Sequence, residues 1–193
     1  RVLRAEHKLY PEAIKLFEKC TSNYFNRHPS KYAALAYNDY GYTWGQKSEY
    51  QKQADCLLNA MRIYDLVKGA EAGEIAVTLG NLSTVYYSLN DRAKAIVYAL
   101  KAIPYREKAN DISGLAISCC NLSQMYIGVD INEAVKYQEL CVKYSAQSGD
   151  EARMLHSFIT SSLIANNQKD NGKALSFELK AISLLEKNKK DAR

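Results

Sequence analysis

Two stretches of this chain, NLSTVYYSLN at residues 81–90 and NLSQMYIGVD at residues 121–130, are alike and lie forty residues apart. Asparagine, leucine and serine coincide in both, and a tyrosine (Tyr86, Tyr126) follows the serine by three residues. Self-similarity at a fixed period indicates a chain built from repeated structural units. The comparison therefore predicts repeats of about forty residues.

A second pattern follows each of these stretches. RAKAIVYALKAI at residues 92–103 aligns with INEAVKYQELCV at 131–142 and with GKALSFELKAIS at 172–183. YPEAIKLFEKC at 10–20 and QADCLLNAM at 53–61 are further, looser copies. One alanine marks the same place in every copy, with steps of 41, 41, 39 and 40 residues: Ala13, Ala54, Ala95, Ala134 and Ala174.

Each repeat reads as two helices. Apolar residues recur at spacings of three and four, as in Leu79, Leu82 and Val85, which is the period of an amphipathic helix. Polar turns with helix-starting residues separate these segments, for example at 90–91, 110–111, 149–150 and 170–172. The first predicted helix ends at about residue 8, and the others span residues 10–26, 30–45, 49–68, 73–89, 91–109, 111–127, 131–148, 151–167 and 171–189.

The pattern resembles the tetratricopeptide repeat (TPR) family, whose first helix carries W-x2-L-G-x2-Y and whose second carries A-x3-F. Leu82-Ser83-x2-Tyr86 and Leu122-Ser123-x2-Tyr126 match the first element, and Ala13-x3-Phe17 matches the second. Ser161-Ser162-x2-Ala165 is a degenerate copy. The period is about forty rather than 34 residues, as in the long-period variants of bacterial regulators.

The resemblance implies an all-α fold, an α–α superhelix in the form of a right-handed solenoid of about five helix-turn-helix repeats. Their approximate ranges are 1–28, 29–69, 70–109, 110–149 and 150–193. We expect a single repeat domain over residues 1–193 that is a fragment of a longer chain. Tyrosines recurring where helices should face one another are expected in its core: Tyr37, Tyr40, Tyr64, Tyr86, Tyr98, Tyr126 and Tyr137.

The sequence contains no pattern that is typical of a catalytic or cofactor-binding site. The three histidines, His7, His28 and His156, are far apart, and neither a glycine-rich phosphate loop nor a metal-ligand spacing is present. We therefore expect no enzyme activity, no cofactor and no metal. The net charge is only +5, and acidic residues are interspersed among the basic ones, which disfavours direct nucleic-acid binding. No apolar run reaches eighteen residues, so this segment should not insert into a membrane.

The five cysteines show no regular disulfide spacing. Cys20 and Cys141 fall where other repeats have a small alanine, so both are expected to be buried free thiols. Cys119 and Cys120 are consecutive on one helix and should face different directions, Cys119 into the core and Cys120 towards a groove. This usage favours a reducing compartment such as the cytoplasm. The periplasmic side of a membrane-anchored regulator stays an alternative.

In the TPR family the first helix of each repeat lines the concave surface, and the resemblance implies a protein- or peptide-binding face there. The expected residues are Asn38, Tyr42, Val77, Asn81, Thr84, Tyr87, Ile117, Cys120, Asn121 and Gln124, followed by His156, Thr160 and Asn167. Asn81 and Asn121 occupy equivalent positions, and their amides can donate and accept hydrogen bonds with an extended peptide backbone. An asparagine that ties one helix to its neighbour is the alternative reading.

The main functional hypothesis is a non-catalytic peptide- or protein-binding scaffold. By family analogy it would be the sensor or interaction domain of a bacterial signalling or transcription-regulating protein. One rival is a structural assembly or adaptor module that uses its convex face or its ends. The other is a small-ligand sensor with an aromatic groove made of Tyr40, Tyr42, Trp44 and Tyr87. The sequence leaves the ligand, the flanking effector domain and a homodimer open.

Overall fold

The computed structural model describes residues 10–21 and 24–191, and all regular structure in these ranges is α-helical. The helices are α1 (Tyr10–Thr21), α2 (Tyr24–Arg27), α3 (Lys31–Gly45), α4 (Tyr50–Leu66), α5 (Ala72–Ser88), α6 (Arg92–Lys108), α7 (Ile112–Tyr126), α8 (Ile131–Ser148), α9 (Glu151–Asn167) and α10 (Asn171–Asp191).

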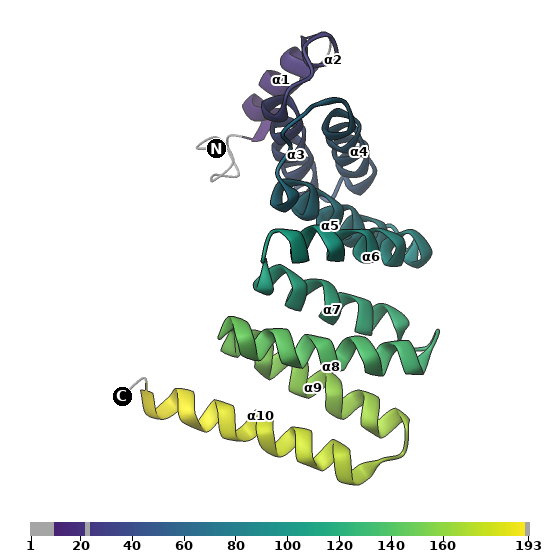
Figure 1. Cartoon of the computed structure of the whole chain (residues 1–193), viewed down its shortest axis with the longest axis vertical. Coiled ribbons are helices and arrows are strands. Elements are labelled where there is room, and N and C mark those ends of the chain that lie inside the picture. The colour runs from purple at the N-terminus through teal and green to yellow at the C-terminus, as the bar shows by residue number, and fades with distance from the viewer. Residues whose placement is uncertain (1–9, 22–23, 192–193) are drawn as a thin grey trace. The chain divides into compact units, whose positions relative to one another are not determined.

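The chain divides into two compact units between Ala109 and Asn110. In unit 1, which contains α1 to α6, α3 packs on α4, α5 packs on α6, and α4 also packs on α5. In unit 2, α7 packs on α8, α9 packs on α10, and α8 packs on α9 (Figure 1). Within each unit the second helix of one pair therefore packs on the first helix of the next. The predicted all-α fold of repeated helical pairs is confirmed.

The predicted helix boundaries agree closely with the observed ones from residue 30 onwards. The segment predicted over 73–89 is α5 at Ala72–Ser88, and the segment predicted over 91–109 is α6 at Arg92–Lys108. The prediction was wrong for residues 10–26, where two helices, α1 and α2, replace one continuous helix. The helix predicted before residue 9 lies outside the described residues.

Aspartates at the predicted turns start five of the helices. In each case the side-chain carboxylate accepts a hydrogen bond from a backbone N–H in the first turn: Asp91, Asp111, Asp130, Asp150 and Asp170. Such a bond satisfies one of the amides that a helix start leaves without an intrahelical partner. Asn90 and Asn110, just before two of these caps, adopt left-handed φ angles of 60° and 51°, which asparagine tolerates better than most residues.

Small residues lie where the two helices of a pair cross. Gly41 of α3 shows how close the crossing is, since a Cβ atom there would lie 3.3 Å from the Cβ of Cys56 on α4. Ser83 and Ser123, which replace the glycine of the TPR pattern, are almost fully buried. The marker alanines Ala54 and Ala95 are 0% exposed. The regular recurrence of small residues in the sequence thus reflects close helix packing.

Stacked tyrosines fill the space beside two of these crossings. The rings of Tyr86 on α5 and Tyr98 on α6 have centroids 5.3 Å apart and an interplanar angle of 7°. In unit 2 the rings of Tyr126 on α7 and Tyr137 on α8 repeat this arrangement, with values of 5.7 Å and 3°. These contacts confirm the prediction that the recurring tyrosines pack where the paired helices face each other.

Candidate binding surface

The exposed side of α5 carries four of the residues that the sequence analysis selected. Val77, Asn81, Thr84 and Tyr87 follow one another at spacings of four, three and three, which places them on one face of the helix. All four are exposed, Val77 and Tyr87 to 50% each. The opposite side of α5 is buried against α4 and α6. This face therefore offers two large apolar groups, one amide and two hydroxyls, those of Thr84 and Tyr87, to a partner.

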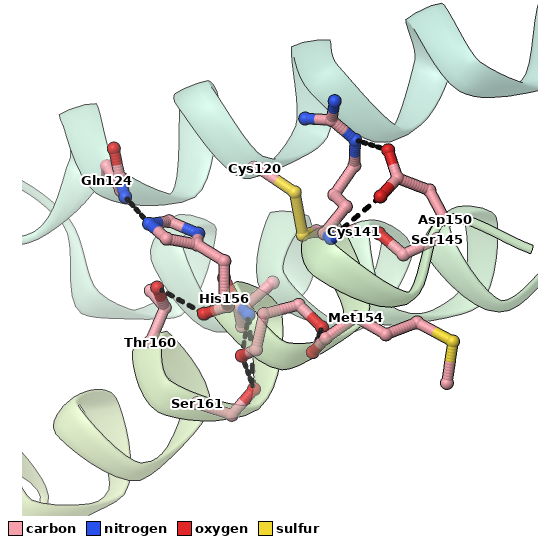
Figure 2. The surroundings of a disulfide bond; sticks show 12 residues. Cys120, Gln124, Cys141, Ser145, Asp150, Met154, His156, Thr160 and Ser161 are labelled. Atoms are coloured by element: carbon pink, nitrogen blue, oxygen red, sulfur yellow. Dashed lines mark hydrogen bonds and ion pairs between the residues drawn. A yellow bond between two sulfur atoms is a disulfide. The ribbon is translucent and has the colours of Figure 1, made fainter. Parts of the chain in front are cut away.

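The equivalent side of α7 in unit 2 carries a similar set. Ile117 is 36% exposed, Asn121 is half-buried and Gln124 is exposed. The Nε2 atom of Gln124 lies 3.3 Å from Nε2 of His156 on α9, which links the first helices of the two pairs in this unit (Figure 2). We use the name first-helix face for each of these two sets, which belong to different units: Val77, Asn81, Thr84 and Tyr87 of α5 in unit 1, and Ile117, Asn121 and Gln124 of α7 in unit 2.

The amides of Asn81 and Asn121 differ from that of Asn38. The Nδ2 group of Asn38 on α3 donates a hydrogen bond of 2.8 Å to Oγ1 of Thr78 on α5. Asn38 therefore links the first helix of one pair to the first helix of the next pair. Within the described part of the chain, no hydrogen bond engages the side-chain amide of Asn81 or Asn121. The helix-tying reading therefore applies to Asn38, while Asn81 and Asn121 keep their donors and acceptors for other partners.

Cys120, which the sequence analysis placed beside Asn121 on this surface, is not part of it. It is only 6% exposed and forms a disulfide with Cys141 of α8 (Figure 2). The expectation that Cys141 is a free thiol was therefore wrong as well, although Cys141 is buried as predicted. Cys20 was expected to be buried and is exposed.

The slots that hold this disulfide contain Gly80 and Ala102 in the preceding repeat. There the buried side chain of Arg106 occupies the space above Gly80. A Cβ atom on residue 80 would lie 2.7 Å from the nearer terminal nitrogen of Arg106. Sequence reasoning missed this buried arginine, and the glycine opposite it is the one signal that could have suggested it.

Two buried groups of α4, in the core of unit 1, remain neutral at physiological pH. Burial raises the pKa of Tyr64 on α4 to about 12, and the charge of Glu74 adds to this rise, while the nearby Thr78 and Asn38 side chains oppose it. Burial also raises the pKa of the Cys56 thiol to about 12. Neither group is activated for acid–base or nucleophilic chemistry, which needs a pKa near the working pH. The surface is thus equipped for hydrogen bonding and apolar contact.

Among the residues that the structure describes, no cluster of three or more histidine, cysteine, aspartate or glutamate side chains could hold a metal ion. No helix in residues 10–21 and 24–191 combines the length and apolar character required to cross a membrane.

Comparisons with known proteins place this fold. No protein-family model matches the sequence, and no curated protein matches it. Solved structures do resemble it. BtubC (BKLC) from P. vanneervenii superposes with a TM-score of 0.80 at 18% identity, over 97% of this chain and 75% of BtubC. YrrB, a TPR protein with an unusual peptide-binding site, superposes with a TM-score of 0.67 at 19% identity, over 91% of this chain and 77% of YrrB.

A TPR-like protein of known structure, a putative kinesin light chain from Podosopora anserina, gives a TM-score of 0.75 at 16% identity over 95% of this chain and 90% of its own. At this level of identity the likeness concerns the fold alone. The chain has the all-α helical repeat fold of TPR proteins, as its resemblance to the family implied.

Proposed function

We propose that this protein is a non-catalytic scaffold that binds a protein or peptide segment through the first-helix face. The observation that supports this most strongly is the row of exposed Val77, Asn81, Thr84 and Tyr87 along α5. Exposed apolar side chains that lie together on one helix face, next to polar groups, are typical of a protein-interaction surface. The peptide-binding site of YrrB, a protein of similar fold, is consistent with this role.

The chemistry of the first-helix face suits an extended segment. A side-chain amide can donate to a backbone carbonyl and accept from a backbone N–H, so Asn81 in unit 1 and Asn121 in unit 2 can each bind a peptide backbone whatever its side chains are. Val77 and Tyr87 on α5 supply apolar contacts in unit 1, and Ile117 on α7 supplies one in unit 2. Because no ionisable group carries the contact, we expect binding to depend weakly on salt.

A finer assignment follows the resemblance to regulators. We propose that the scaffold serves as the sensor or interaction domain of a bacterial signalling or transcription-regulating protein, with contact to nucleic acid left to other parts of that protein. A DNA-binding or kinase segment in the flanking sequence of the gene would support this assignment. An adaptor role would be favoured if the flanking sequence held no effector domain.

One observation favours an assembly module as the second candidate. Helix α10 exposes four large apolar side chains to between 46% and 58%: Leu175, Leu179, Ile182 and Leu185. Such a face suits stacking on another subunit. The aromatic small-ligand groove receives less support, because Tyr40 is buried in the core, where it packs against Trp44 and Phe17.

The test of the scaffold is a double substitution, Asn81→Ala with Asn121→Ala. A peptide display library is selected on the wild-type protein, and the affinity of one enriched peptide is measured by calorimetry. Loss of two amide contacts, each contributing about 0.5–1.5 kcal/mol, should weaken binding roughly tenfold or more. The circular dichroism spectrum should not change, because both amides lack partners within the fold.

The matched control exchanges two exposed amides on second helices, Gln51→Ala on α4 with Gln147→Ala on α8, and should leave the affinity unchanged. Equal affinity for wild type and the Asn81/Asn121 double variant would rule out the proposed role of these amides.

A further inference from the structure

Unit 2 contains a cavity of about 280 Å³, and no residue of α7 lines it. It lies between α8, α9 and α10. Most of its exposed wall is apolar, although five of its ten lining residues are polar or charged, among them Glu139 and Lys173. The lining residues that matter for its chemistry are Val135, Gln138, Ile164, Ala165, Lys173 and Phe177.

The cavity coincides with a missing aromatic ring. Tyr86 and Tyr98 stack in one repeat and Tyr126 and Tyr137 stack in the next. In the last repeat the sequence alignment puts Ala165 in the place of the first tyrosine and Phe177 in the place of the second. Both Ala165 and Phe177 line the cavity. The last repeat thus has the second ring of a stacked pair, Phe177, but lacks the first, and the cavity adjoins Phe177.

A lysine beside the cavity also corresponds to one in the repeat where Tyr86 and Tyr98 stack. In unit 1, Nζ of Lys94 lies 5.0 Å from the centre of the Tyr86 ring and 2.8 Å from the carboxylate of Asp91. Lys173 is the equivalent residue in the last repeat, and its ammonium lies 3.5 Å from the carboxylate of Asp170. Since Lys173 lines the cavity, a ring placed there would find both a stacking partner and a neighbouring cation.

The cavity wall is held in place by hydrogen bonds. Gln138 of α8, 4% exposed, donates through Nε2 to the backbone carbonyl of Ser157 and to the hydroxyl of Ser161, at 2.6 and 3.1 Å. Its Oε1 atom accepts no hydrogen bond within the described residues. Buried acceptors in proteins normally have a donor, and a ligand hydroxyl is a donor of that kind. The wall is therefore fixed in position and has an acceptor to spare.

We propose that this cavity is a binding site for one planar aromatic ring of benzene or phenol size, stacked on Phe177 beside Lys173. Size agrees with this, because an apolar cavity of about 150 Å³ accepts benzene and typical ligand pockets begin near 300 Å³. The ring is that of an aromatic side chain on a bound partner or of a free monocyclic compound. The proposal does not depend on the first-helix face.

The experiment uses p-cresol, the side-chain analogue of tyrosine, and follows its binding to the full chain by NMR titration. Its saturated counterpart, 4-methylcyclohexanol, has the same carbon skeleton but is not planar. We expect saturable binding of p-cresol, with shifts confined to α8, α9 and α10, and at least tenfold weaker binding of 4-methylcyclohexanol. Equal binding of the two compounds would overturn the proposal, and so would p-cresol shifts elsewhere.

Ala165→Tyr is the decisive variant, because it restores the tyrosine that the other repeats possess. It should raise the melting temperature by several degrees and reduce the affinity for p-cresol at least tenfold. Ala152→Tyr, at an exposed position on the same helix, should do neither. Phe177→Leu tests the stacking contact without adding bulk and should weaken p-cresol about two- to tenfold. Unchanged affinity in the folded Ala165→Tyr variant, or in Phe177→Leu, contradicts the site.

A second ligand identifies the source of the ring. N-acetyltyrosinamide carries the same ring with peptide groups on both sides. Binding of both ligands indicates an aromatic side chain of a partner segment, and binding of p-cresol alone indicates a free monocyclic compound.

Discussion

Replacing Leu82 by alanine is expected to lower the free energy of unfolding of unit 1 by about 3 kcal/mol, within a usual range of about 2–5 kcal/mol. Leu82 is 0% exposed and packs in a cluster with Ala54 and Leu57 of α4. It therefore lies between one helical pair and the next. A smaller side chain would leave a cavity at the contact on which stacking of the pairs depends, since one pair cannot bury its apolar side alone.

Urea unfolding followed by the fluorescence of Trp44 is the appropriate measurement. Trp44 is the single tryptophan of the chain, and it belongs to unit 1, so its signal reports on the unit that contains Leu82. Leu66→Ala is the matched control, because Leu66 on α4 is 63% exposed and its truncation should cost less than about 1 kcal/mol. Similar losses in the two variants would contradict the account of how the pairs pack.

Removing the disulfide has an expected effect of comparable size. The double variant Cys120→Ala with Cys141→Ala should be less stable than the oxidised wild type by about 3 kcal/mol. The two cysteines are 21 residues apart in sequence, and a cross-link over such a loop restricts the unfolded chain. Both cysteines are changed together, so that neither is left as an unpaired thiol in the place of the disulfide.

Thermal unfolding with and without a reducing agent provides the measurement and its control. Reduction should lower the melting temperature of the wild type to near that of the double variant and should leave the double variant itself unchanged. A wild-type melting temperature that is insensitive to the reducing agent would show that the Cys120–Cys141 bond does not contribute to stability. The circular dichroism signal suits this test because unit 2 contains no tryptophan.

The repeats and helices could be predicted from the sequence because their signals are local. A marker alanine, an aspartate cap and an apolar stripe each act within one or two turns of helix, and α5 and α6 therefore begin and end within a residue or so of the prediction. The exposed side of α5 was also predictable, since the positions of Leu79 and Leu82 on the buried side fix which residues lie opposite.

The disulfide could not be predicted, because it depends on which positions of two crossing helices meet. The equivalent residues in the preceding repeat are Gly80 and Ala102, which give no sign that the two slots lie opposite each other. In the structure the Cα atoms of Cys120 and Cys141 are 4.9 Å apart. The sequence-based argument for a reducing compartment loses its basis with this bond, since stable disulfides are typical of oxidising environments.

For the cavity near Phe177, the sequence showed that a tyrosine of the repeated motif is missing, but it did not show that a cavity results. Ala165 stood out as a departure from the repeated motif. Whether neighbouring side chains close over such a gap depends on packing that no sequence pattern specifies. Here α8, α9 and α10 leave it open.

The central claim is that a partner segment binds along the first-helix face, and mapping the contact by backbone amide shifts tests it most directly. A peptide without aromatic residues, selected on the wild-type protein, is titrated into the labelled chain so that the cavity near Phe177 is not engaged. The account predicts the largest shifts at Asn81 and Thr84 on α5 and at Asn121 and Gln124 on α7. Shifts concentrated on α10, around Leu179 and Ile182, would contradict it and indicate the assembly module instead.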